Sequence, residues 1–181
     1  MMKKEKELLV AVASQKGGVG KSVFTVLLAS VLHYRKDVRV AVVDCDSPQH
    51  SIALMRERDM ETVMKTDELK VNLSRQYERI RKPAYQDIKS DPEKGVEDLR
   101  RYMDEKGETF DIVLFDLPGT LRSEGVVHTV AAMDYIFVPL KADNIVMQSS
   151  LQFTKVLEEE LIAKGNCNLK GIRLFWNMVD R

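Results

Sequence analysis

Cysteine is scarce in this sequence. Its 181 residues include only two cysteines, Cys45 and Cys167. Two cysteines so far apart are too few for a disulfide framework or for a four-ligand zinc site. The reducing cytoplasm is therefore the expected setting of the chain.

The sequence also lacks an excess of charge of one sign and a long hydrophobic run. Its 28 Lys and Arg residues balance 28 Asp and Glu residues, so no basic excess suggests nucleic-acid binding. No apolar run approaches the roughly 18 residues that a membrane-spanning helix needs. With 44% hydrophobic and 31% charged residues, the composition is typical of a folded protein rather than a disordered one. We expect one domain over residues 1–181, with a sizeable core.

The N-terminus has some features of a secretory signal. Met1–Lys6 is partly basic, and Leu8–Ala13 is apolar. However, Glu5 and Glu7 interrupt the basic stretch, and the apolar run is shorter than that of an ordinary signal peptide. We therefore interpret this segment as the first buried strand.

Short apolar segments alternate with longer amphipathic ones along the chain. The predicted strands are Leu8–Ser14, Val38–Asp44, Phe110–Asp116, Tyr135–Leu140 and Gly171–Trp176. The predicted helices are Lys21–Tyr34, Ser47–Arg58, Pro92–Lys106, Ser123–Met133 and Asn144–Lys164. Strands that are apolar almost throughout suit a parallel sheet covered on both faces. The alternation predicts an α/β fold with a doubly wound, mainly parallel sheet flanked by helices.

One region, residues 59–106, is dense in charged side chains and is interrupted by Pro83, Pro92 and Gly95. We interpret it as a charged insertion of helices and loops at the edge of the sheet. An alternative is that it recognises a partner through a basic patch. That patch would consist of Arg75, Arg79, Arg81, Lys82 and Lys89.

A glycine-rich loop follows the first predicted strand and opens the first predicted helix. It reads Ser14-Gln15-Lys16-Gly17-Gly18-Val19-Gly20-Lys21-Ser22. Glycines allow backbone N–H groups to converge on an anion, and a helix N-terminus adds unpaired donors. In such a phosphate-binding loop Lys21 would reach the β- and γ-phosphates, and the Ser22 hydroxyl would bind Mg²⁺. A glycine-rich turn without a ligand is the alternative.

The loop departs from the standard phosphate-binding pattern in one place. Gln15 stands where the standard pattern has its first glycine, and Lys16 precedes the paired glycines. This form resembles the deviant Walker A motif of the ParA/MinD family of ATPases. The resemblance implies that Lys16 reaches the phosphates of a partner subunit in a nucleotide-sandwich dimer. Relatives commonly have Thr at Val23, where only the backbone N–H remains for the α-phosphate.

Two carboxylates, Asp44 and Asp46, close the second predicted strand. Near a triphosphate, one such group can hold a magnesium-bound water while the other orients the attacking water. The pair resembles the Asp-x-Asp switch of the same family, which implies that Asp46 assists hydrolysis. Ser47 interrupts the family pattern, so no role is transferred to the residues after it. Helix capping by Asp46 or Ser47 is an alternative compatible with that role.

Two further strand ends carry residues of the same motif set. Asp116 ends the third predicted strand, where a carboxylate can support Mg²⁺ through its waters. Asp116, Pro118 and Gly119 resemble the family's second switch, which implies that the Gly119 N–H senses the γ-phosphate. An ordinary proline turn is the alternative. Asn177 follows the last predicted strand, and the resemblance implies that it reads the adenine edge.

The resemblance covers Leu8–Arg181 and implies a P-loop ATPase domain that lacks the closing elements of the family. We therefore expect a chain truncated at its C-terminus, most like the ParA-like partition proteins of conjugative and other mobile elements.

The functional prediction is a Mg²⁺-dependent ATPase whose slow hydrolysis switches a homodimer. The resemblance implies a role in partitioning DNA or positioning other cargo, with non-specific DNA and an activator protein as partners. Two alternatives remain. One is a nucleotide-binding interaction module that does not hydrolyse ATP, and the other is an ATP-dependent biosynthetic enzyme of the same superfamily.

Overall fold

The computed structural model describes residues 6–119, 124–163, 165 and 167–179. Within them, six parallel strands form one sheet in the order β3-β2-β4-β1-β5-β6. The strands are β1 (Leu8–Val12), β2 (Val40–Asp44), β3 (Gln86–Lys89), β4 (Ile112–Asp116), β5 (Tyr135–Leu140) and β6 (Gly171–Trp176). This sheet confirms the predicted parallel α/β fold.

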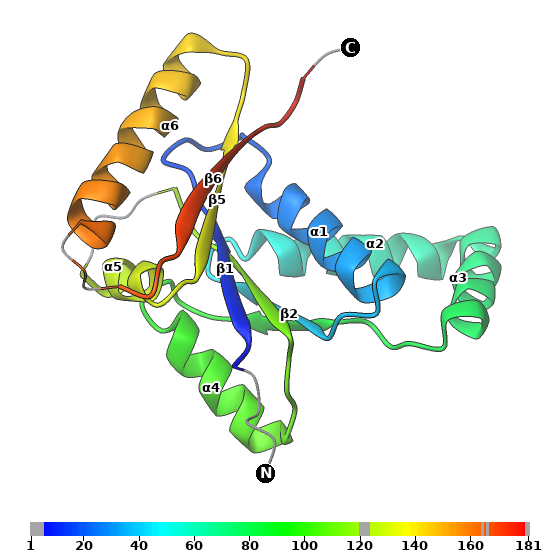
Figure 1. The fold of residues 1–181 in the computed structure, drawn as a ribbon. Coiled ribbons are helices and arrows are strands. Elements are labelled where there is room, and N and C mark those ends of the chain that lie inside the picture. The colour runs from blue at the N-terminus through cyan, green and yellow to red at the C-terminus, as the bar shows by residue number, and fades with distance from the viewer. Residues whose placement is uncertain (1–5, 120–123, 164, 166, 180–181) are drawn as a thin grey trace.

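Helices occupy both faces of the sheet (Figure 1). They are α1 (Lys21–Arg35), α2 (Ser51–Lys65), α3 (Asp67–Ile80), α4 (Gly95–Lys106), α5 (Glu124–Ala131) and α6 (Asn144–Leu157), which continues as a π-helical turn over Glu158–Ile162. Ser123, the predicted start of α5, lies outside the described residues. Across the described part of the chain, no helix is long and apolar enough to cross a bilayer.

The core lies in two layers because consecutive strand residues point to opposite faces. Leu9 and Ala11 of β1 belong to the cluster under α4, α5 and α6, whereas Val10 belongs to the cluster under α1 and the start of α2. All five residues of β2 are buried. Burial on both faces explains why these strands are apolar almost throughout their length.

The strand order reverses beside β1, and this point positions the site. The chain runs from β1 outward to β2 and β3, then returns to β4 and crosses to β5 and β6. As a result, Asp116 at the end of β4 is the register partner of both Val12 and Asp44. Ligands of open α/β sheets bind at the carboxyl ends of the strands at such a reversal.

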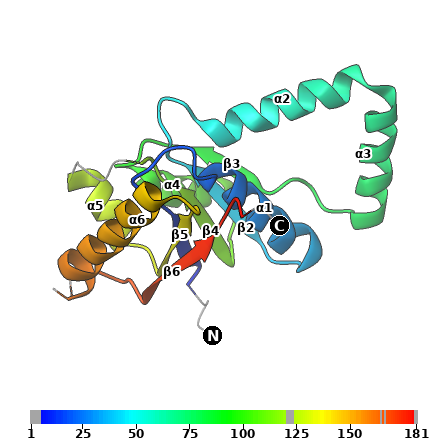
Figure 2. The same ribbon diagram turned by 90° about the horizontal axis from the view of Figure 1, so that it is seen from above.

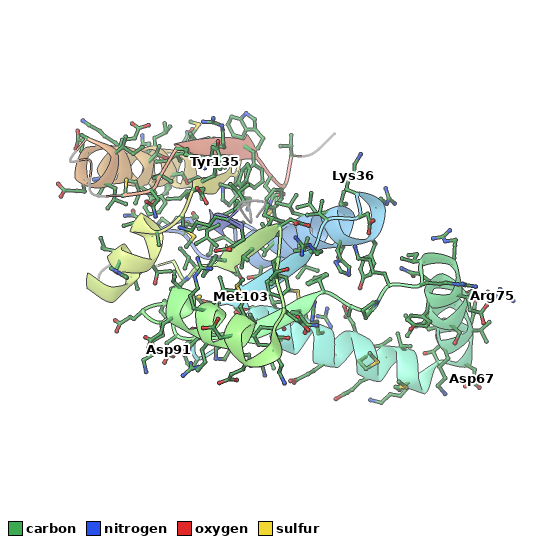
Figure 3. The ribbon with its side chains drawn as sticks, turned by 60° about the horizontal axis from the view of Figure 1, so that its bottom comes forward. Lys36, Asp67, Arg75, Asp91, Met103 and Tyr135 are labelled. Carbon is green, nitrogen blue, oxygen red and sulfur yellow. The ribbon has the colours of Figure 1, made fainter. Side chains whose placement is uncertain are left out.

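Helices α2 and α3 form an arm that extends from the body of the molecule (Figure 2). No residue of α3 is buried. Figure 3 shows that Asp67 and Arg75 of this helix lie at the far end of the arm. Two members of the predicted basic patch, Lys82 and Lys89, lie outside α2 and α3. Lys82 donates to Asp37 (2.9 Å), and Lys89 pairs with Glu57 (3.5 Å).

The sequence analysis did not predict β3, and it predicted different bounds for α2. β3 is a short edge strand in which only Ile88 is buried. It therefore lacks the apolar run by which the other strands were recognised. The predicted helix 47–58 begins instead at Ser51 and extends to Lys65.

Candidate functional site

The glycine-rich loop connects β1 to α1 and requires glycine at two positions. Gly18 and Gly20 have φ angles of 71° and 81°, a left-handed conformation that side chains disfavour. A Cβ atom at Gly20 would also lie 2.6 Å from the Nδ2 atom of Asn177. The loop therefore folds tightly against the end of β6, and the backbone stays exposed along Gly17 and Gly18.

The N-terminus of α1 is open to an anion. Gly20 is its N-cap, no side chain caps the helix, and its first turn contains no acidic residue. The first backbone bond runs from the Phe24 N–H to the Gly20 carbonyl (2.9 Å), so the N–H groups of Lys21, Ser22 and Val23 remain available. Unpaired donors at the positive end of a helix dipole favour phosphate.

A cavity of about 470 Å³ lies over this loop. It is lined by Gly17, Gly18, Gly20, Lys21, Ser22, Val23, Asp46, Gln49, Ser51, Met55 and Gly119. The structure thus brings most of the predicted phosphate-binding residues into one hollow together with Asp46. Gln49, Ser51 and Met55 were not predicted. Gln49 lies in the turn that precedes α2, and Ser51 and Met55 lie at the start of that helix.

Asp116 lies beside the loop with an unpaired carboxylate. Its side chain is fully buried, and neither carboxylate oxygen has a hydrogen-bond partner among the described residues. Burial raises the pKa of Asp116 to about 7, and Asp44 and Asp46 raise it further. The Ser22 hydroxyl and the Lys21 ammonium lower this pKa; the Ser22 hydroxyl lies near the carboxylate without the geometry of a hydrogen bond. A buried carboxylate without a donor fits a cation, and the hydroxyl of Ser22 is a suitable second oxygen ligand.

The protein residues alone do not complete a cation site. Among the described residues, no group of three or more His, Cys, Asp and Glu side chains could hold a metal ion. Mg²⁺ keeps several waters and is usually bound by one or two protein ligands together with substrate phosphates. Ser22 and Asp116 therefore fit Mg²⁺ that arrives with a nucleotide.

Asp44 has a different position from the one expected of a metal ligand. Its Oδ2 atom accepts hydrogen bonds from the N–H groups of Ile52 (3.0 Å) and Ala53 (3.2 Å), and its Oδ1 atom accepts from the Asp46 N–H (3.3 Å). The side chain is fully buried. This geometry favours an anchoring role at the start of α2 over the predicted binding of Mg²⁺, because both oxygens already have donors.

Asp46 is held at the edge of the cavity by the segment that leads into α2. Its carbonyl accepts from the His50 N–H (2.7 Å), and its Oδ2 atom accepts from the Ser51 hydroxyl (2.9 Å). The N-cap of α2 is His50, in a left-handed conformation with φ of 44°. Neither Asp46 nor Ser47 is the N-cap, so the capping alternative for these two residues is wrong.

Three other predicted residues, Lys16, Val19 and Asn177, do not line the cavity. Lys16 is exposed, and Val19 is buried. The Asn177 side-chain amide donates to the Val19 carbonyl (2.8 Å). A Cβ atom at Gly119 would lie 3.3 Å from the Gln15 carbonyl oxygen, so the turn after β4 lies directly against the loop.

Comparisons with solved structures agree with this architecture. A protein described as a plasmid partition protein from Borrelia burgdorferi B31, bound to AMPPNP, is 20% identical with a TM-score of 0.60, covering 98% of this chain and 78% of its own. The MinC:MinD cell division complex of Aquifex aeolicus matches at 18% identity and a TM-score of 0.64. The match covers 96% of this chain and 69% of the chain from that complex. A ParA family ATPase from Chlorobium tepidum TLS matches at 16% identity and a TM-score of 0.61. The match covers 96% of this chain and 75% of the Chlorobium tepidum chain. At these identities the likeness shows the fold.

Sequence comparison identifies the family. No individual curated protein sequence matches the chain. Residues 8–149, more than half of the chain, match the sequence pattern of the family described as ATPase MipZ. This match confirms the predicted relationship to the ParA/MinD ATPases and shows that the chain belongs to the ATPase MipZ family.

Proposed function

We propose that the protein is a Mg²⁺-dependent ATPase and that the cavity over the glycine-rich loop is its active site. The observation that carries this proposal is the buried, unpaired carboxylate of Asp116 beside the phosphate-binding loop. Such a group has an unfavourable free energy unless a cation or a proton accompanies it. A nucleotide bound with Mg²⁺ supplies that cation.

Each residue of the site has a proposed part in hydrolysis. The loop amides and the Lys21 ammonium hold the phosphates, and Ser22 and Asp116 hold Mg²⁺, which when bound offsets the charge of the β- and γ-phosphates. Asp46 orients a water whose oxygen bonds to the γ-phosphorus while the bond to the bridging oxygen breaks. The products are ADP and phosphate. The Gly119 N–H is a donor to the γ-phosphate.

We propose that ATP also controls assembly. Lys16 is exposed and does not line its own cavity, which suits a lysine that completes the site of a second subunit. Asn177, which already contacts the loop, is proposed to face the adenine. The AMPPNP bound to the Borrelia burgdorferi protein supports an adenine nucleotide as ligand.

The family supports a role in partitioning or positioning. We propose DNA, including mobile elements, as the cargo, with an activator protein as partner. The charged region 59–106 is proposed to be the part that recognises the cargo or the activator protein.

The proposal is tested by measuring Mg²⁺-dependent phosphate release from ATP by the full chain and by Asp46→Ala. We expect slow turnover that is lost on chelation of Mg²⁺ and reduced at least about tenfold in Asp46→Ala. ATP affinity should be retained, because Asp46 does not belong to the loop. Nucleotide binding without any turnover, alone or with DNA, would favour the non-hydrolysing module instead.

A further inference from the structure

We propose that Ser51 is a positioning residue for hydrolysis, which it serves by fixing the carboxylate of Asp46. This inference rests on the proposed function, because it gives Asp46 the task of orienting water. Its basis is the hydrogen bond from the Ser51 hydroxyl to the Asp46 Oδ2 atom (2.9 Å). Both side chains line the nucleotide cavity.

The backbone around Asp46 is fixed without Ser51. The Asp46 N–H donates to the Asp44 carboxylate (3.3 Å), and the Asp46 carbonyl accepts from the His50 N–H (2.7 Å). These two bonds determine where the Cα atom of Asp46 lies. They leave the side-chain torsions free, and among the described residues the Ser51 hydroxyl is the group that restrains them.

The hydroxyl of Ser51 is not needed to start α2. No side chain of the N-cap, His50, caps the helix. The N–H groups of Ile52 and Ala53 are instead paired with the Asp44 carboxylate (3.0 and 3.2 Å). Removal of the Ser51 hydroxyl should therefore leave the fold unchanged and release only the Asp46 side chain.

The geometry also leaves Asp46 one free oxygen. Oδ2 accepts from Ser51, while Oδ1 has no hydrogen bond among the described residues. A carboxylate fixed through one oxygen holds the other in a set direction, and Asp46 lines the cavity. Fixed orientation of a group that holds the attacking water lowers the entropy cost of reaching the transition state.

The experiment compares Ser51→Ala, Ser51→Thr and Thr62→Ala in the full chain, by steady-state hydrolysis of Mg²⁺-ATP and by titration with a fluorescent ATP analogue. Thr62 is a matched control, because its hydroxyl donates to the Arg58 carbonyl (2.9 Å) on the exposed part of the same helix. We expect Ser51→Ala to lower kcat about tenfold, as loss of a hydrogen bond to a charged group would.

Further readouts separate positioning from a structural role. KM and analogue affinity should stay within about twofold of wild type, Ser51→Thr should restore most of kcat, and Thr62→Ala should change nothing. In an Asp46→Ala background, Ser51→Ala should cause no further loss. An unchanged or faster rate in Ser51→Ala would overturn the inference. If Asp46→Ala itself retains the wild-type rate, the proposed role of Asp46 is wrong instead.

Discussion

At the residue scale, Asp116 combines an unfavourable burial in the fold with a central place in the proposed site. Its carboxylate is fully buried without a hydrogen-bond donor among the described residues. A residue selected only for stability would not be placed in this way, because a buried unpaired carboxylate is destabilising. The raised pKa makes this cost measurable.

We predict that Asp116→Asn stabilises the protein in the absence of nucleotide and Mg²⁺. The pKa of Asp116 is about 7 in the folded state against 3.8 for an ordinary aspartate. Between these values the folded state retains a proton that the unfolded state has lost, so stability falls as the pH rises from about 4 to about 7. Asp116→Asn removes this decline and gains at most about 4 kcal/mol above pH 7.

The measurement is urea unfolding at pH 5 and pH 8, monitored by circular dichroism. Asp104→Asn is the matched control, because Asp104 is exposed on α4. It should keep the wild-type pH dependence. If the free energy of unfolding changes with pH as much in Asp116→Asn as in wild type, the prediction is contradicted. Excess Mg²⁺ and ATP should make wild type more stable than Asp116→Asn, because a ligand stabilises only the protein that binds it.

At the element scale, the start of α4 packs closely against β4 and against Cys45, the residue that follows β2. A Cβ atom at Gly95 would lie 2.9 Å from the Sγ atom of Cys45 and 3.3 Å from the Cε1 atom of Phe115. Both neighbours are fully buried. Burial, above all, also raises the pKa of the Cys45 thiol, so this cysteine is a packing residue rather than a nucleophile.

We predict that Gly95→Ala destabilises the protein by about 1–3 kcal/mol, the usual cost of overpacking a core. In a Cys45→Ala background the same change should cost clearly less, because the sulfur atom that it would meet is absent. Thermal unfolding of the two single variants and the double variant completes a double-mutant cycle. Additive effects would show that the contact with Cys45 is not the cause.

The arm and the site are connected through α2. One end of this helix carries Ser51 and is anchored by Asp44, while the other end leads into α3, which has no buried residue. An isolated helix of this length is marginal in water. The arm therefore depends on its anchor at the sheet.

At the scale of the whole molecule, the proposed switch is dimerisation. We predict that Lys16→Ala abolishes the mass increase caused by Mg²⁺-ATP, because a subunit without Lys16 cannot reach its partner's phosphates. Multi-angle light scattering with and without the nucleotide makes the comparison. Lys36→Ala is the control, since Lys36 is an exposed lysine at the opposite end of α1 (Figure 3). A dimer retained by Lys16→Ala would refute the shared site.

The fold class and the glycine-rich loop could be predicted from the sequence. The positions of the glycines, Lys21 and Ser22 follow from local backbone geometry, which a contiguous motif specifies. The buried strands were recognisable because both of their faces are covered, which makes them apolar throughout. Asp116 could be placed beside the loop because parallel strands end at one edge of the sheet.

Features that depend on distant or exposed elements could be seen only in the three-dimensional structure. β3 has little apolar character, and its pairing with β2 comes from the sheet rather than from its own residues. Asp44 and Asp46 look equivalent in the sequence. They differ because the left-handed turn at His50 directs the start of α2 onto Asp44 and the Ser51 hydroxyl onto Asp46. Such a difference arises from three-dimensional hydrogen bonding, which residue spacing does not encode.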